Sequence, residues 1–244
     1  MQSFIAVDIE TTGLSPEKDH IIEIGALKYV NGKCVETFSE LVKPPVSISY
    51  RIYEITGIND KTVEHASPIS VVMKKFLDFI GEEQVLLGHN LKFDYSFLKT
   101  AAKQLGISFE KMGLDTLLLA RKFLSELPSK NLATVSTHYG IVNERAHRAY
   151  EDAKTTAEVF FAMEIQFAER MPEAFLPKEM QYKVKKVEPA TDRQKNYLID
   201  LLKYHKIQVE QFFDERGTTI DDLTKSQASK MIDGMILQYG RIRR

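Results

Sequence analysis

Apolar and polar residues at the start of the chain follow the pattern of β-strands. Residues 3–10 form an almost continuous apolar run, which predicts a buried strand that ends on acids. Two more strand-like runs, Ile21 to Tyr29 and Lys33 to Val42, flank Asn31-Gly32, the strongest short-range signal for a β-hairpin. Pro44-Pro45 cannot donate hydrogen bonds to a ladder. We therefore expect three antiparallel strands that end before these prolines.

The pattern then changes to helices separated by short strands. Residues 62–80 carry an apolar stripe at helical spacing, and Val85 to Gly88 is a short apolar run typical of a central strand. The further expected elements are a helix at 94–106, a strand ending at 114–115, and helices at 116–124, 131–139 and 151–170. This is a mixed α/β layout, with helices on both faces of a sheet and sites at the strand ends.

The C-terminal part of the chain has a different character. Residues 173–190 lack an apolar period and contain four lysines, so we expect a linker. Thr191 and Thr224 are expected to cap two amphipathic helices, with a third, short helix at 209–213. The predicted organisation is an α/β domain over residues 1–172, a linker over 173–190 and a small helical domain over 191–244.

Composition narrows the cellular setting. Cys34 is the single cysteine among 244 residues, which excludes a disulfide framework and favours a reducing compartment. No run approaches the roughly 18 apolar residues of a membrane span, so we expect a cytoplasmic protein without membrane contact. Residues 178–244 hold 14 Lys and Arg against 10 Asp and Glu, whereas residues 1–177 hold 19 against 24. A cluster of metal-binding carboxylates would make the main domain acidic in this way.

Asp8 and Glu10 lie two residues apart on the first predicted strand. Successive side chains of a strand point to opposite faces, so the two carboxylates share one face. Two uncompensated charges at the edge of a core are costly, and a divalent cation would stabilise them; the alternative is a pair of solvated acids. Asp94 follows the predicted central strand and can therefore face Asp8. Its alternative role is to stabilise the N-terminus of a helix.

His147 and Asp152 stand five residues apart. On one continuous helix they would point about 140° away from each other, so we expect His147 on a loop and Asp152 on the helix behind it. A loop histidine by itself is usually surface decoration, and an aspartate near a helix start is usually a partner of the helix dipole.

The order of these residues resembles the DEDDh exonuclease family, and in particular the proofreading subunits and domains of bacterial replicative DNA polymerases. Three motifs within residues 3–170 carry the resemblance: Asp8-Ile-Glu10-Thr-Thr-Gly13-Leu14, Gly88-His89-Asn90-Leu-Lys-Phe93-Asp94 and His147-Arg-Ala-Tyr-Glu-Asp152-Ala153. The family implies an RNase H-like fold, here a mixed five-stranded sheet flanked by helices, and the removal of mononucleotides from a 3′ end.

The resemblance implies that Asp8, Glu10, Asp94 and Asp152 bind metal and are catalytic together with His147. Four carboxylates can hold two Mg²⁺ or Mn²⁺ ions about 3.5–4 Å apart, one activating water and the other stabilising the leaving 3′ oxygen. Asp8 would bridge the two ions. His147 would take a proton from the attacking water as general base, because an imidazole titrates near neutral pH.

Substrate contacts are expected in the first two motifs. The candidate substrate-binding residues are Thr11, Thr12, Gly13, Leu14, His89, Asn90 and Phe93. The resemblance suggests that Thr11 and nearby backbone amides hold the terminal 3′ hydroxyl and that Leu14 wedges against the last base. Phe93 can stack on any base. Loop anchoring by Leu14 and core packing by Phe93 are the structural alternatives.

The sequence thus predicts a metal-dependent 3′-to-5′ exonuclease acting on DNA in proofreading or repair. Its expected partners are nucleic acid 3′ ends, single-stranded DNA above all, and a DNA polymerase. Two alternatives stay open: an exoribonuclease that trims RNA 3′ ends, because the sequence places no contact to a 2′-hydroxyl, and a catalytically inactive nucleic-acid-binding module. Arg241, Arg243 and Arg244 can meet phosphates or form a solvated terminus.

Overall fold

The computed structural model describes residues 3–184, 188–214, 219–221 and 223–242. The chain forms two compact units, Met1–Val184 and Lys185–Arg244, each with its own core. Residues 173–184, expected to begin a linker, belong to the first unit. There the 3₁₀ helix Pro172–Phe175 buries Phe175 and a short strand pairs with the sheet. Residues 185–187 of the expected linker lie outside the described residues.

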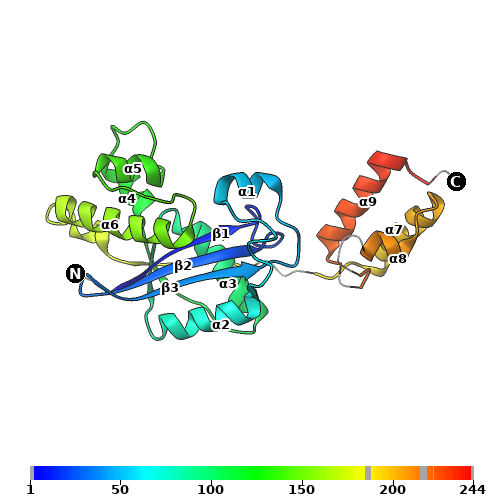
Figure 1. Ribbon diagram of the computed structural model, residues 1–244, viewed down its shortest axis with the longest axis horizontal. Coiled ribbons are helices and arrows are strands. Elements are labelled where there is room, and N and C mark those ends of the chain that lie inside the picture. The colour runs from blue at the N-terminus through cyan, green and yellow to red at the C-terminus, as the bar shows by residue number, and fades with distance from the viewer. Residues whose placement is uncertain (1–2, 185–187, 215–218, 222, 243–244) are drawn as a thin grey trace. The chain divides into compact units, whose positions relative to one another are not determined.

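Over the described residues, the first unit is built on a seven-stranded mixed sheet (Figure 1). Its strands are β1 (Phe4–Thr11), β2 (Ile21–Val30), β3 (Lys33–Lys43), β4 (Ser67–Pro68), β5 (Val85–Gly88), β6 (Met112–Asp115) and β7 (Lys178–Glu179), in the order β4-β3-β2-β1-β5-β6-β7. β1 to β3 form the expected antiparallel meander, and β5 pairs parallel to β1. The five expected strands are confirmed, and the two-residue strands β4 and β7 extend the sheet at its edges.

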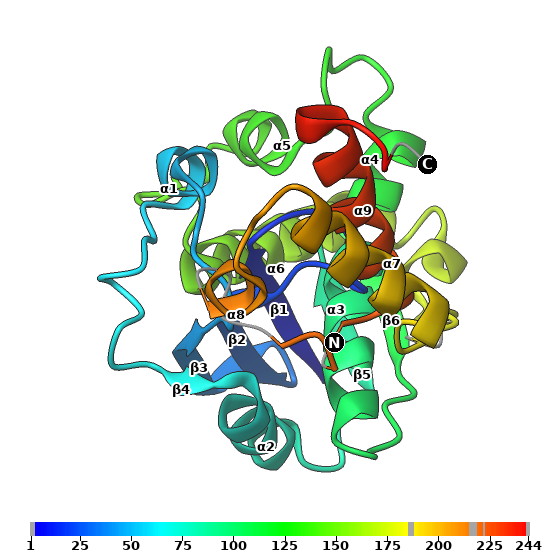
Figure 2. The same cartoon turned by 90° about the vertical axis from the view of Figure 1, so that its right-hand side faces the viewer.

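Helices cover both faces of the sheet, as the layout predicted. They are α1 (Tyr50–Thr56), α2 (Ile69–Ile80), α3 (Leu91–Gln104), α4 (Thr116–Phe123), α5 (Leu132–His138) and α6 (Ala149–Phe167). One apolar core joins the sheet to α2 and α3, and a second core joins its other face to α4, α5 and α6. In both views α2 and α6 lie on opposite sides of β1 to β3 (Figures 1 and 2).

Two segments differ from the expected elements. The helix expected over residues 62–80 begins at Ile69, because Pro68 occupies its N-cap position and residues 67–68 pair with β3. Helix α1 was not expected at all. Its N-cap Ser49 accepts a hydrogen bond from the Ile52 amide, and it ends at Gly57 with a left-handed φ of 69°. A helix of seven residues is too short for apolar periodicity to announce it.

The second unit is a small helical bundle. Its helices are α7 (Asp192–Tyr204), α8 (Val209–Asp214) and α9 (Lys225–Tyr239). The expected caps Thr191 and Thr224 each form a capping box, in which the hydroxyl accepts from the third helical amide and a glutamine three residues on accepts from the cap amide. Arg243 and Arg244 lie outside the described residues. Across the described part of the chain, no helix has the length and apolar character needed to cross a membrane.

Candidate active site

The end of β1 directs two carboxylates to one face of the sheet. Ile9 packs in the core shared with α2 and α3, whereas Ala6 packs in the core shared with α6. Because side chains alternate along a strand, Asp8 and Glu10 share the α6 face with Ala6. Both are partly buried. Two acids thus meet the helix that carries the third motif.

Asp152 is buried near the start of α6, and His147 lies on the loop before it. Asp152 Oδ1 accepts a hydrogen bond from Asn143 Nδ2 at 2.5 Å, and Oδ2 accepts one from the His147 amide at 3.0 Å. The backbone at His147 is left-handed, with φ 63°. This sharp turn brings the loop residue beside the helical aspartate.

Glu10, His147 and Asp152 come close enough to share a metal ion. One potential ligand atom of each lies within 4.8 Å of the other two, and the imidazole is exposed while Asp152 is buried. The three residues come from β1, the loop before α6 and α6 itself. The structure therefore assembles residues that are up to 142 positions apart in the sequence.

Asp94 reaches the same strand end from α3. It lies in the first turn of that helix, is only 3% exposed, and its Oδ1 accepts a hydrogen bond from the Ile9 amide at 3.1 Å. Ile9 stands between Asp8 and Glu10, so this carboxylate lies against the backbone that joins them. All four acids of the three motifs therefore lie around the end of β1.

Burial and mutual repulsion raise the pKa values of these acids. For Asp8, burial is the largest cause, followed by the charges of Asp94 and Asp152, and its pKa lies well above the usual range. Burial, Asp152 and Glu23 raise the pKa of Glu10 to about 8. Burial also raises the pKa of Asp94 and Asp152, although hydrogen bonds oppose the rise. A divalent cation would relieve this repulsion, and carboxylate oxygens are the ligands that Mg²⁺ and Mn²⁺ prefer.

The turn after β1 is held by internal hydrogen bonds and ends in an exposed leucine. Thr11 Oγ1 donates to the Gly13 carbonyl at 2.6 Å, and Thr12 Oγ1 accepts an amide hydrogen bond from across the turn at 2.9 Å. A Cβ at Gly13 would lie 2.6 Å from the Asp19 carboxyl group, so a larger residue here would displace the carboxylate that accepts from the Ser15 amide. Leu14 is 85% exposed, so packing within the loop does not account for it.

The turn between β5 and α3 carries the other candidate substrate contacts. His89 Nε2 donates to the Lys130 carbonyl at 2.8 Å, and Nδ1 lies 2.8 Å from Thr116 Oγ1, so both ring nitrogens have protein partners. Asn90 is exposed, with a left-handed φ of 69°. Phe93 is half-buried and packs on another ring of α3 at a centroid distance of 5.0 Å. Of these three residues, Asn90 is the one that is exposed to solvent.

An ion pair beside the acids, between a buried glutamate and a partly exposed arginine, was not predicted from the sequence. Arg148 donates to Glu23 through Nε and Nη2, the shortest contact being 2.6 Å. The signal available in the sequence was one acid within the otherwise apolar run Ile21-Ile22-Glu23-Ile24. A buried carboxylate without a partner is so unfavourable that this position called for a cation from elsewhere in the chain.

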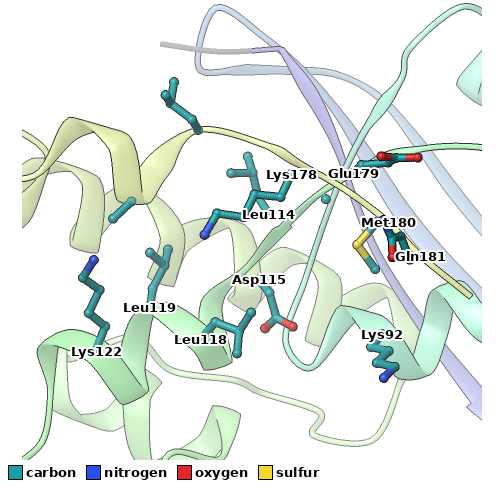
Figure 3. A pocket seen from close by; sticks show the side chains of 13 residues that line it. Lys92, Leu114, Asp115, Leu118, Leu119, Lys122, Lys178, Glu179, Met180 and Gln181 are labelled. Atoms are coloured by element: carbon teal, nitrogen blue, oxygen red, sulfur yellow. The ribbon is translucent and has the colours of Figure 1, made fainter.

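Two hollows lie near the strand ends. One, of about 350 Å³, opens between β6, α4 and β7, with Lys122 and Lys178 on its wall (Figure 3). Asp115 also lines this hollow, but its Oδ1 accepts a hydrogen bond from the Asn90 backbone amide at 3.0 Å. None of the five expected catalytic residues lines the hollow. The other hollow, of about 550 Å³, is lined by His147 and Asp152 together with apolar residues of α5 and the following loop. The second hollow therefore adjoins the acids.

The fold and the converging acids are those of a nuclease of the RNase H-like class. The profile of the exonuclease family RNase_T matches residues 5–160, and the chain belongs to this family. Its motifs make it a 3′-to-5′ exonuclease of the DEDDh type, similar to polymerase proofreading domains.

A curated relative supports this assignment. The chain is 46% identical over 160 residues to the DNA polymerase III PolC-type of Caldanaerobacter subterraneus subsp. tengcongensis, and the match covers 66% of this chain but 11% of the relative. The chain thus spans about a tenth of the length of such relatives.

Solved structures show the same fold at low sequence identity. The nuclease domain of 3′hExo bound to rAMP superposes with a TM-score of 0.61 at 20% identity, covering 73% of this chain and 97% of that one. Exonuclease I of E. coli in complex with a dA16 oligonucleotide gives a TM-score of 0.61 at 19% identity, covering 86% of this chain and 47% of that one.

Proposed function

We propose that the protein releases nucleoside monophosphates from DNA 3′ ends in a metal-dependent reaction that serves proofreading or repair. The observation that carries this proposal is the gathering of Asp8, Glu10, Asp94, Asp152 and His147 around one strand end. The names of the PolC-type DNA polymerase III relatives support DNA as the substrate. An inactive binding module would have no use for four mutually repelling carboxylates.

The four acids would hold two divalent ions, Mg²⁺ or Mn²⁺. Bound there, the ions would activate the attacking water and stabilise the leaving 3′ oxygen. The donor set fits such ions, since it consists of carboxylates whose pKa values are raised by burial and by the charges of neighbouring acids. Asp8 would hold metal together with the other three acids, since the charges of Asp94, Asp152 and Glu10 all act on its carboxylate.

His147 would act as the general base. Its exposed imidazole lies beside Glu10 and Asp152, and the hydrogen bond from its own amide to Asp152 constrains the backbone that carries it. The water oxygen would bond to phosphorus as the bond to the 3′ oxygen breaks. The water proton would pass to the neutral imidazole and on to solvent, and the leaving 3′ oxygen would take a proton from solvent.

The terminal nucleotide would lie between the turn after β1 and the loop before α6. Thr11 and neighbouring amides would hold the 3′ hydroxyl, and the exposed Leu14 would pack on the last base. Asn90 and the ring of Phe93 would contact base or sugar from the other side. His89 would position this turn through its two protein partners instead of touching the substrate.

The deciding experiment is digestion of 5′-labelled single strands. DNA and RNA of the same sequence are incubated with Mg²⁺, Mn²⁺ or a chelator and resolved at single-nucleotide resolution. We expect DNA to shorten stepwise from the 3′ end, RNA to be cut at least about tenfold more slowly, and the chelator to stop both reactions. Faster cleavage of RNA would favour the exoribonuclease, and no cleavage of either would overturn the proposal. Faster removal of a mismatched than of a matched 3′ terminus would support proofreading.

The helical unit would add contacts outside the catalytic domain. We propose two domains that divide between residues 184 and 185, with a DNA polymerase as partner and a cytoplasmic location as further predictions. The unit is the more basic part of the sequence, and its Arg241 is exposed. Deleting residues 190–244 is expected to weaken binding to single-stranded DNA and reduce its salt dependence. Unchanged binding would exclude this role.

A further inference from the structure

Glu23 of β2 is a buried carboxylate outside the four proposed metal ligands. Its side chain is 2% exposed. Oε1 accepts hydrogen bonds from Arg148 Nη2 at 2.6 Å and Nε at 3.1 Å, and Oε2 accepts from the Ala149 amide at 3.0 Å. A carboxylate held by a guanidinium fork and a backbone amide is oriented as well as neutralised.

These contacts cap α6 from a distant strand. Arg148 occupies the N-cap position of α6, but its own side chain makes no capping hydrogen bond. The carboxylate of Glu23, 126 residues earlier in the chain, accepts from the first helical amide instead. A negative charge at a helix N-terminus is favourable, because the free amides and the helix dipole both attract it.

The first turn of α6 also touches β2 directly. A Cβ built at Gly25 would lie 2.1 Å from the Tyr150 amide nitrogen, so this strand position must be glycine for the helix to approach. Gly25 and Glu23 are two residues apart and therefore share the same face of β2. The N-terminus of α6 is thus fixed on β2 by close backbone contact and by an ion pair.

We call the contacts of Glu23 with Arg148 and the Ala149 amide the clamp. Two residues of the proposed active site lie close to Arg148 in the chain. His147 is its immediate neighbour, and the Asp152 amide donates to the Arg148 carbonyl at 3.0 Å. Glu23 stands opposite Glu10 in the β1–β2 ladder. The ion pair therefore sits between the strand that bears Glu10 and the loop and helix that bear the other two members of the group.

We propose that Glu23 and Arg148 are positioning residues: the ion pair between the buried Glu23 and the partly exposed Arg148 fixes the start of α6 on β2 and so places His147 and Asp152 against Glu10. This inference rests on the proposed nuclease function of that group. Arg148 and Glu23 need not touch substrate or metal. Their effect passes through the loop and helix that Arg148 joins.

The test uses the full chain and three variants: Glu23→Gln, Arg148→Lys and the double variant Glu23→Gln/Arg148→Gln. Mn²⁺ affinity is measured by calorimetry without substrate, and kcat and KM are measured with labelled single-stranded DNA. We expect Glu23→Gln to weaken Mn²⁺ binding about tenfold and to lower kcat about 10- to 100-fold, as the loss of groups that support ligands does. KM should change less than about threefold, since the proposed substrate contacts lie elsewhere.

Two comparisons separate positioning from general stability. Arg148→Lys keeps the charge but loses the fork, so it should retain more activity than the double variant. The double variant should lose about as much kcat and Mn²⁺ affinity as Glu23→Gln alone, because the two residues act as a unit. Glu40→Gln, which breaks the solvent-accessible pair between Glu40 of β3 and Lys75 of α2, is the matched control and should leave both measurements unchanged.

The outcomes divide cleanly. Wild-type Mn²⁺ affinity and kcat in folded Glu23→Gln would overturn the inference, and so would a lower melting temperature with unchanged kcat per folded molecule. If Glu23→Gln does not fold, Arg148→Lys decides, and wild-type values for it would overturn the inference. If the wild-type chain binds Mn²⁺ but cleaves neither DNA nor RNA, the proposed function fails, while the Mn²⁺ affinities of the variants still decide the clamp.

Discussion

Two carboxylates that face each other across the β1–β2 ladder, Glu10 and Glu23, are held in opposite ways. Glu23 is bound by the Arg148 guanidinium and the Ala149 amide. Within the described residues, no donor hydrogen-bonds to the carboxylate of Glu10, and burial is the main cause that raises its pKa to about 8. The fold thus supplies Glu23 with a positive charge through Arg148, whereas Glu10 has no such hydrogen-bonded cation in the described part of the chain and needs another source of positive charge. A metal ion supplies that charge in our proposal.

Asp94 and Asp152 stand between these extremes. Each accepts hydrogen bonds that fix the direction of its oxygens, from Ile9 in one case and from Asn143 and His147 in the other. Even so, burial keeps the pKa of both above the usual range. Hydrogen bonds from neutral donors therefore orient these ligands without supplying the positive charge that Glu23 receives.

The largest effect is expected from Asp8→Asn, which removes one charge from the repelling group and keeps its shape. A bound ion contributes several kcal/mol of transition-state stabilisation, so cleavage should fall by about 10³-fold or more. Mn²⁺ binding should weaken, while the metal-free variant should melt a few degrees higher because repulsion is relieved. Gel assays, calorimetry and thermal melts check these results. Retained activity, or a lower melting temperature without metal, would contradict the assignment.

Replacement of His147 tests the proposed general base separately from the carboxylates that would bind metal. His147→Ala should lower kcat by about 10²- to 10⁴-fold, the range of general base catalysis, while Mn²⁺ binding changes far less. The wild-type rate should rise with pH through the neutral region, and the variant should lose this rise. His65→Ala is the matched control, since that side chain is 95% exposed. A His147→Ala profile that matches wild type from about pH 6 to 9 would refute the general base role.

The pH dependence of stability sharpens the contrast between Glu10 and Glu23. The pKa of Glu10 rises from 4.5 to about 8 on folding, so the folded chain holds this proton over a range in which the unfolded chain has lost it. Stability of the metal-free protein should therefore fall as pH rises through that window, by several degrees in melting temperature. Mn²⁺ should restore it most strongly near pH 8, and Glu10→Gln should flatten the profile. A metal-free melting temperature that stays constant or rises from pH 5 to 8 would contradict this account.

The features that could be predicted from the sequence have local causes. Because side chains alternate along a strand, Asp8 and Glu10 could be placed on one face of β1. Asn31-Gly32 predicted the hairpin between β2 and β3, and the threonines at 191 and 224 predicted the starts of two helices. The expected positions of His147 on a loop and Asp152 on a helix also follow from the local geometry of a helix.

The features that could not be predicted depend on contacts between distant residues. Glu23 meets Arg148 across 125 positions, and His89 meets the Lys130 carbonyl across 41. Neither pairing leaves a periodic signal, because each involves one polar side chain whose partner is fixed only once the chain has folded. His89 illustrates the consequence: its place in a motif suggested a substrate contact, whereas folding supplies partners for both ring nitrogens.

The smallest effect is expected at Leu14, which lies next to the acids but adds no charge to either side of the comparison. Leu14→Ala should raise KM for single-stranded DNA about three- to tenfold, because an apolar contact to a base is worth about 1 kcal/mol, and leave kcat nearly unchanged. Its side chain is 85% exposed, so the melting temperature should stay within about 1 °C of wild type. Ile165→Ala is the matched control, since that side chain is also 85% exposed, lies near the C-terminal end of α6 and should affect neither constant. An unchanged KM in Leu14→Ala would show that the carboxylate group, without its apolar rim, accounts for the binding of the 3′ end.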